Sequence, residues 1–239
     1  MFLDNVLAVV VAAGQSRRMG ENVNKLLLPL AGRPVLSYSL AALQEAPFVK
    51  GYVLVVGEKE LDAYRTLAEQ WGCTKMLSLV TGGETRQDSV REGLNVLPED
   101  TRVVIVHDGA RPLVTVDQFD QVVSGALRWS AATLAVPVKD TVKETGLEDF
   151  IIRTLDRESL WLAQTPQAFS YSLLMDAHRI ARRNQRAATD DAGLVEAMGV
   201  PVKIIEGSYR NIKVTTAEDL SMIEFFLQGR DLLGGYGCR

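Results

Sequence analysis

Short apolar runs rich in Val, Ile and Leu recur along the chain, separated by longer segments of mixed polarity. Each run is too continuous for a strand that keeps one face in water, and is typical of a strand buried on both faces. We therefore predict a central, mostly parallel sheet. Its strands span residues 6–11, 52–56, 76–80, 103–106, 133–138 and 202–205.

The segments between these strands carry apolar residues at helical spacing. Thr115 with Gln118, and Thr215 with Glu218, have the spacing of capping boxes and predict the starts of two helices. Alternating strands and helices indicate an α/β fold built from βαβ units. The helical positions are Leu36, Leu40 and Leu43 after Pro34, then 61–68, 90–96, 119–127 and 173–180, and finally Leu220, Ile223 and Leu227.

Two segments depart from this alternation. Residues 139–158 form a polar stretch with Gly146 near its centre, which predicts an extended hairpin arm. Residues 229–239 contain several glycines and little apolar surface, so this tail is expected to fray. Neither a repeat nor a low-complexity linker divides the chain, and we predict one domain over residues 1–239.

Charge and cysteine content narrow the possible partners. The 239 residues include 26 Lys and Arg against 30 Asp and Glu, a net charge of −4. Without a global positive field, neither nucleic acid nor a membrane surface is an expected partner, and any phosphate site must be local. The apolar run 6–13 is too short to span a bilayer. Cys73 and Cys238 fit neither a metal nor a disulfide pattern, which indicates a cytoplasmic protein.

The first predicted strand ends in residues suited to phosphate. Ala12, Ala13 and Gly14 are small, so a ligand can approach the backbone N–H groups closely. Arg18 and Lys25 follow, but the spacing matches neither common glycine-rich phosphate loop. The cations can neutralise a triphosphate or can be solvated loop charges, and the loop alone leaves both interpretations open.

Asp108 follows the fourth predicted strand, at the edge where open α/β sheets bind their ligands. A carboxylate there suits a Mg²⁺ ion, bound directly or through water, or a ribose. The adjacent His107 points the opposite way along the strand and is expected to be a packed structural residue. His178 is expected at the surface. A Gly-Gly turn before Thr85 predicts a helix N-cap at that threonine.

Eight motifs, spread in order over nearly the whole chain, carry a resemblance to known enzymes. They are Ala12-Ala13-Gly14 with Arg17-Arg18-Met19-Gly20 and Lys25, the segment 82–90, His107-Asp108-Gly109-Ala110-Arg111-Pro112, 137–141, Asp156-Arg157, Gln164-Thr165-Pro166-Gln167, Thr189-Asp190-Asp191-Ala192 and 211–215. Together they resemble the 2-C-methyl-D-erythritol 4-phosphate cytidylyltransferases of the non-mevalonate isoprenoid pathway. This resemblance implies a three-layer α/β/α Rossmann-like nucleotidyltransferase fold, with a mostly parallel mixed sheet and a protruding β-hairpin arm.

The implied reaction joins the phosphate of methylerythritol phosphate to the α-phosphorus of CTP and expels pyrophosphate. The nucleophile is already an anion, so the chain needs groups that align and neutralise two polyanions rather than a general base. A divalent cation, Mg²⁺ or a similar ion, is expected with the nucleotide. No Ser-His-Asp or Cys-His set is therefore required.

The resemblance also implies roles for individual residues. Arg18 and Lys25 match the positions that stabilise the transition state, while Arg157 and Lys213 match those that hold the polyol phosphate for attack. Asp108, from its place at the end of a predicted strand, is the residue expected near the metal. The nucleotide-binding positions are Ala12, Ala13, Gly14, Gly83, Glu84, Ser89, Asp108 and Gly109, and the further substrate-binding positions are Arg111, Thr141, Thr165 and Thr189.

In the resembled family the arm crosses to a two-fold-related subunit. Thr141 and Arg157 would then complete the site of the partner, which implies a homodimer formed through residues 139–158. Thr189 can equally be the N-cap of the helix that follows it. Arg86 and Asp88 are expected to support the turn before Thr85.

Two alternatives stay open. A ribitol-phosphate cytidylyltransferase shares the class, but Ala12-Ala13-Gly14 and the Asp156-Arg157 pair favour the methylerythritol enzymes. A non-catalytic nucleotide-binding module on the same fold would not need to keep Arg18 and Lys25 together. One departure from the family pattern is Asn24-Lys25-Leu26, where a proline usually precedes the lysine and a glutamine follows it.

Overall fold

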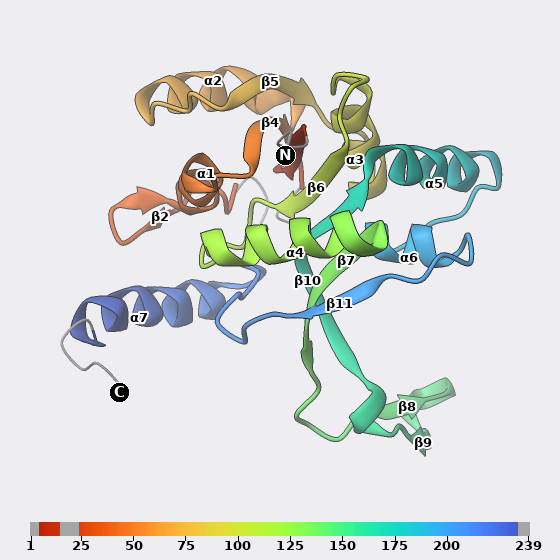
Figure 1. Cartoon of the computed structure of the whole chain (residues 1–239). Helices are drawn as coiled ribbons and strands as arrows, with labels where there is room; N and C mark the ends of the chain where they lie inside the picture. The colour runs from red at the N-terminus through yellow and green to blue at the C-terminus, as the bar shows by residue number, and fades with distance from the viewer. Residues whose placement is uncertain (1–4, 15–23, 234–239) are drawn as a thin grey trace.

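The computed structural model describes residues 5–14 and 24–233 of the chain. Within these ranges the centre is a seven-stranded sheet in the order β11-β7-β10-β6-β1-β4-β5 (Figure 1). Neighbouring strands are parallel, except that β10 runs antiparallel to both β6 and β7. The strands are β1 (Val6–Val11), β4 (Val49–Val56), β5 (Met76–Thr81), β6 (Val103–Asp108), β7 (Ala131–Pro137), β10 (Trp161–Ser170) and β11 (Lys203–Glu206). The predicted mostly parallel sheet is confirmed.

Helices cover both faces of the sheet (Figure 1). Buried residues of α1, α2, α4 and α7 join one apolar cluster, while those of α3, α5 and α6 join the other. The three-layer α/β/α arrangement expected from the resemblance is confirmed. The helices are α1 (Val35–Glu45), α2 (Leu61–Gln70), α3 (Arg86–Asn95), α4 (Val116–Trp129), α5 (Tyr171–Arg183), α6 (Asp191–Glu196) and α7 (Ala217–Leu233), and a short β2 (Pro29–Leu30) to β3 (Arg33–Pro34) ribbon precedes α1.

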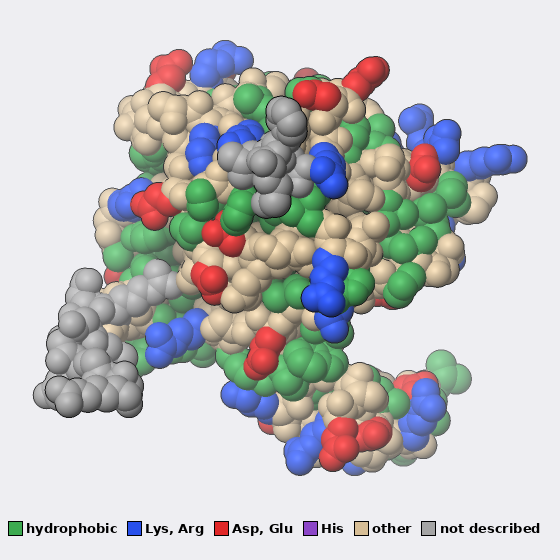
Figure 2. All heavy atoms as spheres, viewed as in Figure 1, with side chains coloured by type: hydrophobic (Ala, Val, Ile, Leu, Met, Phe, Trp, Pro, Cys, Tyr) green, Lys and Arg blue, Asp and Glu red, His purple; other side chains and the backbone are tan. Residues whose placement is uncertain are grey.

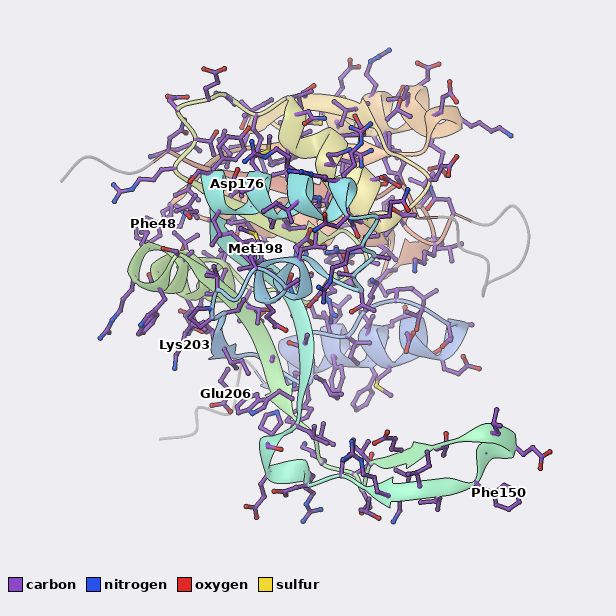
Figure 3. All side chains as sticks on the ribbon, turned by 90° about the vertical axis from the view of Figure 1, so that its right-hand side faces the viewer. Phe48, Phe150, Asp176, Met198, Lys203 and Glu206 are labelled. Carbon is purple, nitrogen blue, oxygen red and sulfur yellow. The ribbon has the colours of Figure 1, made fainter. Side chains whose placement is uncertain are left out.

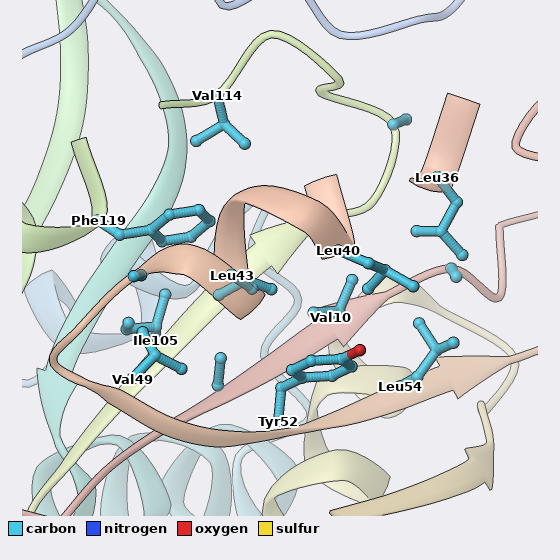
Figure 4. Packing of buried hydrophobic residues seen from close by; sticks show 14 of the residues in the cluster. Val10, Leu36, Leu40, Leu43, Val49, Tyr52, Leu54, Ile105, Val114 and Phe119 are labelled. Carbon is cyan, nitrogen blue, oxygen red and sulfur yellow. The ribbon is translucent and has the colours of Figure 1, made fainter. Parts of the chain in front are cut away.

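Strand β1 shows why its sequence is continuously apolar. Its alternate residues enter opposite clusters, with Ala8 and Val10 on one face and Leu7 and Val9 on the other. In the first cluster, Leu40 and Leu43 of α1 pack over Val10 and over Tyr52 of β4 (Figure 4). Because helices cover both faces, both sets of side chains are buried, and in this strand both sets are apolar.

The apolar runs did not predict β10, although it is an interior strand, between β7 and β6. Its centre is polar, with Gln164, Thr165 and Gln167 all buried. Buried polar groups need partners, and each of these side chains has at least one hydrogen bond. A strand that carries site residues through a core therefore lacks the periodicity by which a strand is recognised.

The two edge strands are less buried than predicted. Leu77 of β5 has an exposed fraction of 54%, and Ile204 of β11 is also exposed. Each edge strand pairs with one neighbour, so part of its surface faces solvent.

Two of the predicted helix starts are confirmed, and one is wrong in detail. Capping boxes open α3 at Thr85 with Asp88 and α4 at Thr115 with Gln118. At α7 the carboxylate of Asp219, not Glu218, accepts hydrogen bonds from the backbone N–H groups of residues 215 and 216. The helix begins at Ala217, so the third helical position is 219.

Residues 139–158 leave the sheet as the predicted arm. Strands β8 (Lys143–Thr145) and β9 (Ile151–Thr154) pair antiparallel, and the hairpin projects from the body of the molecule (Figures 1 and 2). Phe150 points outward near the tip, with 71% of its surface exposed (Figure 3). The arm thus presents apolar side chains with little contact to its own domain.

The structure modifies the prediction for the tail. Helix α7 continues to Leu233, so the first part of the segment 229–239 is helical rather than frayed, and residues 234–239 lie outside the described ranges. None of the helices in the described part of the chain has the length and apolar content to cross a membrane.

Candidate functional site

A cavity of about 190 Å³ opens where β6 ends beside the polar centre of β10. It contains five of the predicted site residues, which come from distant parts of the sequence. The residues that line it are Arg86, Asp108, Arg111, Ala163, Gln164, Thr165, Gln167, Thr189, Asp190 and Lys213. The predictions for Asp108, Arg111, Thr165, Thr189 and Lys213 therefore converge on one place, while their roles stay predictions.

Asp108 is one of two carboxylates in the cavity wall. Arg86 Nε donates to its Oδ1 at 3.0 Å, and Lys213 Nζ donates to its Oδ2 at 2.7 Å. Burial by itself would raise the pKa of Asp108, but the positive charges of Arg86, Lys213 and Arg111 outweigh burial and hold the pKa well below its usual range. Asp108 is thus ionised throughout the physiological pH range.

Arg86 has a role that sequence reasoning did not predict. It was expected to support the turn before Thr85, but its guanidinium spans two carboxylates. Besides Asp108, Nη1 donates to Asp191 Oδ2 at 2.7 Å. Of the two residues expected to support the turn, Asp88 does so, because it accepts from the backbone N–H and the hydroxyl of Thr85.

The prediction that His178 lies at the surface is wrong. The side chain is 3% exposed, and Nε2 lies 2.9 Å from Asp191 Oδ1. Leu174, Ala177, His178 and Ala181 form the buried stripe of α5. Their spacing of three and four residues is a signal in the sequence that assigns His178 to the inner face.

Thr165 connects β10 to the end of β6. Its Oγ1 accepts the backbone N–H of Asp108 at 3.0 Å and lies 3.2 Å from His107 Nδ1. His107 also packs edge-on against Phe119. The prediction that His107 is a packed structural residue is confirmed.

His107 gives the protein a specific pH dependence of stability. Burial lowers its pKa from the ordinary 6.5 to about 3, so only the unfolded chain binds this proton between those values. Stability must fall as the pH decreases below 6.5, and from pH 7 to pH 5 this residue accounts for a loss of about 2 kcal/mol. Urea unfolding at both pH values should show this loss in the wild type and a correspondingly smaller loss in His107→Asn. Equal losses in the two proteins would contradict the assignment.

The loop before α7 is fixed to the cavity by Asn211. Its side-chain amide donates to Gln164 Oε1 at 3.2 Å and to the backbone carbonyl of Thr165 at 2.9 Å. Arg111 Nη1 in turn donates to the carbonyl of Asn211 at 2.6 Å. These contacts hold Lys213, two residues later, against β6 and β10.

Asp190, rather than Thr189, is the N-cap of α6, so that alternative interpretation of Thr189 is wrong. Oδ1 of Asp190 accepts the backbone N–H of Gly193 at 3.0 Å. The other oxygen accepts from Gln167 Nε2 at 2.7 Å. Thr189 lies beside this cap and faces the cavity.

A second group of predicted residues meets at the carboxyl ends of β1 and β5. A Cβ added at Gly82 would lie 2.5 Å from Ala13 Cβ and 2.6 Å from Ser89 Oγ, so only glycine allows this close approach. Ser89 Oγ donates to the carbonyl of Thr85 at 2.9 Å. The N–H of Gly109 donates to the carbonyl of Val11 at 3.0 Å, which joins the ends of β6 and β1.

The structure does not place every predicted residue in these groups. Arg18 lies outside the described residues. Lys25 is half-buried and is not among the residues that line the cavity. Thr141 and Arg157 are exposed on the arm, away from the cavity of their own chain, and Arg157 Nη1 donates to the carbonyl of Lys139 at 3.1 Å.

The cavity offers few side chains of the types that bind a metal. No group of three or more His, Cys, Asp or Glu side chains within the described ranges is arranged to hold an ion. Mg²⁺, however, is often held by one or two carboxylates together with substrate phosphates and water. The single carboxylate of Asp108 fits that second arrangement and does not fit an all-protein metal site.

Known proteins of one family are similar to this chain in sequence. The family model of 2-C-methyl-D-erythritol 4-phosphate cytidylyltransferase matches residues 6–229. The protein of that name from Pelotomaculum thermopropionicum is 53% identical over 229 residues, which cover 95% of this chain and 96% of the relative. The one from Desulforamulus reducens is 46% identical over 230 residues, covering 96% and 98%.

Solved structures agree with the sequence comparison. The 4-diphosphocytidyl-2C-methyl-D-erythritol synthase of Anaerococcus prevotii superposes with a TM-score of 0.84 at 28% identity, over 95% of this chain and 99% of that one. The 2-C-methyl-D-erythritol 4-phosphate cytidylyltransferase of Thermus thermophilus gives a TM-score of 0.74 at 32% identity, over 92% and 98%.

Proposed function

This chain belongs to the 2-C-methyl-D-erythritol 4-phosphate cytidylyltransferase family, and on that premise we propose how its residues divide the work of the reaction. The enzyme transfers CMP from CTP to 2-C-methyl-D-erythritol 4-phosphate, giving 4-diphosphocytidyl-2-C-methyl-D-erythritol and pyrophosphate in isoprenoid precursor synthesis. The observation that carries the assignment of roles is the cavity in which Asp108, Thr165 and Lys213 converge.

The polyol phosphate binds in this cavity. Among its lining residues, three cationic side chains (Arg86, Arg111, Lys213) face two carboxylates (Asp108, Asp190), which leaves one net positive charge. An ammonium group has three N–H donors, and Lys213 uses one on Asp108, so two stay available for phosphate oxygens. The hydroxyls of Thr165 and Thr189 add neutral hydrogen-bonding groups.

The nucleotide binds at the neighbouring ends of β1 and β5. Ala12, Ala13 and Gly14 leave room for the ribose and phosphates, and Gly83, Glu84 and Ser89 surround the base. Because Ser89 Oγ already donates to Thr85, its remaining lone pairs suit the amino group of cytosine, which is a donor. Asp108 and Gly109 lie between the two binding sites, at the end of β6.

The chemistry requires in-line alignment and charge stabilisation rather than proton transfer. The phosphate nucleophile, held by Lys213 and Arg157, attacks the α-phosphorus, and pyrophosphate leaves on the opposite side. Arg18 and Lys25 stabilise the charge that builds up on the α-phosphoryl oxygens. Asp108 would hold a Mg²⁺ ion, which supplies further neutralisation of the triphosphate when bound.

The enzyme acts as a homodimer that exchanges its arms. The arm bears exposed apolar side chains, including Phe150, Ile151 and Ile152, and such side chains mark a contact surface. Arg157 and Thr141 do not reach the cavity of their own chain. A dianionic phosphate meets one net positive charge there, and Arg157 from a partner would supply a second.

The remaining assignments concern the whole chain. One sheet with helices on both faces supports a single domain over residues 1–239, with 139–158 as the dimerisation arm. The free thiol of Cys73 suits the reducing cytoplasm. A nucleic-acid partner is not expected at a net charge of −4.

Pyrophosphate release tests the substrate assignment. CTP with methylerythritol phosphate and Mg²⁺ should release pyrophosphate, while ATP, GTP and UTP should be poor donors, because the base pocket must satisfy the donor and acceptor pattern of cytosine. The same assay with ribitol 5-phosphate is the matched control for the acceptor. Faster release with ribitol 5-phosphate would identify that polyol phosphate as the acceptor. No release with either acceptor would contradict the assignment.

A further inference from the structure

A continuous series of polar contacts runs from helix α5, behind the cavity, to the cavity itself. His178 Nε2 contacts Asp191 Oδ1 at 2.9 Å, and Asp191 Oδ2 accepts from Arg86 Nη1 at 2.7 Å. Arg86 Nε then donates to Asp108 Oδ1 at 3.0 Å, and Asp108 Oδ2 accepts from Lys213 Nζ at 2.7 Å. Five side chains from separate elements thus form one series, and His178 and Asp191 are not among the cavity-lining residues.

Burial makes this series different from a surface network. The side chains of Asp191 and His178 are 1% and 3% exposed, and Asp108 is 9% exposed. Buried charges without partners are strongly destabilising, so each member constrains the next. Arg86 fixes both carboxylates at once, because its planar guanidinium presents donors in set directions, which a flexible ammonium would not.

We propose that His178, Asp191 and Arg86 form a positioning relay that fixes Asp108 and, through it, the ammonium group of Lys213. The Asp191 carboxylate has one oxygen bound to Arg86 and the other to His178, so the imidazole limits rotation of the carboxylate. The fixed carboxylate orients the guanidinium, and the guanidinium fixes Asp108 Oδ1. Asp108 Oδ2 then holds Lys213 in one direction, with two N–H donors toward the cavity.

This inference rests on the proposed role of Lys213 in holding the polyol phosphate. A relay that acts through Lys213 affects mainly the binding and alignment of that substrate. The nucleotide, bound at the ends of β1 and β5, should be affected much less, and only through the Mg²⁺ ion that Asp108 would hold. His178 is therefore a positioning residue. Its substitution should impair the use of one substrate more than the other, whereas a general loss of stability would impair both equally.

Two substitutions of His178 separate the contact from the packing. His178→Leu removes the polar contact to Asp191 but keeps an apolar side chain on the buried face of α5. His178→Gln keeps a side-chain donor that can reach Asp191. We expect His178→Leu to lower kcat/KM for methylerythritol phosphate about ten-fold and His178→Gln to keep most of the wild-type value, with a much smaller change in KM for CTP in both variants.

The decisive measurement is a double-mutant cycle with Lys213→Met. If His178 acts through Lys213, His178→Leu should cause the ten-fold loss in the wild-type background and almost none in the Lys213→Met background. Equal fold-losses in both backgrounds would overturn the relay, because independent effects multiply. A wild-type kcat/KM in His178→Leu, with only a lower Tm, would overturn it as well.

Asp191→Asn is the second variant, in case leucine at position 178 prevents folding. It keeps the shape of the side chain and removes its charge, and it should raise the Kd for methylerythritol phosphate by a larger factor than the Kd for CTP. Calorimetric binding gives both Kd values without turnover. If the relay is wrong, the ratio of the Kd for methylerythritol phosphate to the Kd for CTP is the same in the variant as in the wild type. If the proposed function is wrong, the wild type releases no pyrophosphate.

Discussion

Lys213→Met should lower kcat/KM for methylerythritol phosphate by about 10²–10³-fold, because it removes a preorganised cation from the attacking phosphate. The methionine keeps the aliphatic length of the lysine side chain. Asp108 keeps its ion pair with Arg86, so the buried carboxylate is not left without a partner. Steady-state kinetics with each substrate varied in turn, together with thermal unfolding, measure the effect.

The split between the two substrates makes this prediction specific. KM for CTP should change little, because the nucleotide binds at the ends of β1 and β5. Lys203→Met is the matched control: Lys203 is an exposed lysine on β11 that contacts the Trp129 ring, and its loss should leave kcat/KM unchanged. An equal rise in KM for CTP and for the polyol phosphate in Lys213→Met would contradict the placement of Lys213.

Mixing two inactive variants should restore about one quarter of wild-type activity, if the arm of each subunit completes the site of its partner. Arg157→Ala removes the cation from the arm, and Lys25→Ala removes one from the body of the domain. In a mixed dimer one site lacks both residues, and the other has both. Half of the dimers in an equal mixture are mixed, and half of the sites in each mixed dimer are intact.

Subunit exchange must be demonstrated for this experiment, for example by native mass spectrometry of differently tagged chains. Arg157→Ala mixed with the wild type at equal ratio shows the dilution expected without complementation. Proven exchange with no recovery in the Arg157→Ala and Lys25→Ala mixture would place Arg157 in the site of its own chain, or outside any site. The arm would then serve only to hold the subunits together.

Several elements of the fold were predictable because they depend on local pattern. Strand β1 was predicted with its observed bounds, since burial on both faces requires a continuous apolar run. Capping boxes at Thr85 and Thr115 use side chains three residues apart and need no distant contact. The hairpin arm was predictable because a solvated segment interrupts the alternation of apolar elements.

The strand that organises the cavity was not predictable from local pattern. β10 carries buried polar residues through the interior of the sheet, and their burial is tolerated because distant residues, among them Asn211, Thr133 and Asp108, provide partners. Those partners come from other strands and loops. A strand of this composition resembles a loop until its neighbours are known.

By itself, the sequence determined the class of fold, the family and five of the ten residues that line the cavity. The tertiary structure decided how these residues are connected. Arg86 meets Asp191, and Lys213 meets Asp108, across 105 positions of sequence in each case. The buried position of His178 becomes functional only through such a contact. Periodicity and capping are local properties of the sequence. Ion pairs between distant residues depend instead on which strands and helices become neighbours in the folded protein, and that arrangement is fixed by packing of the whole chain.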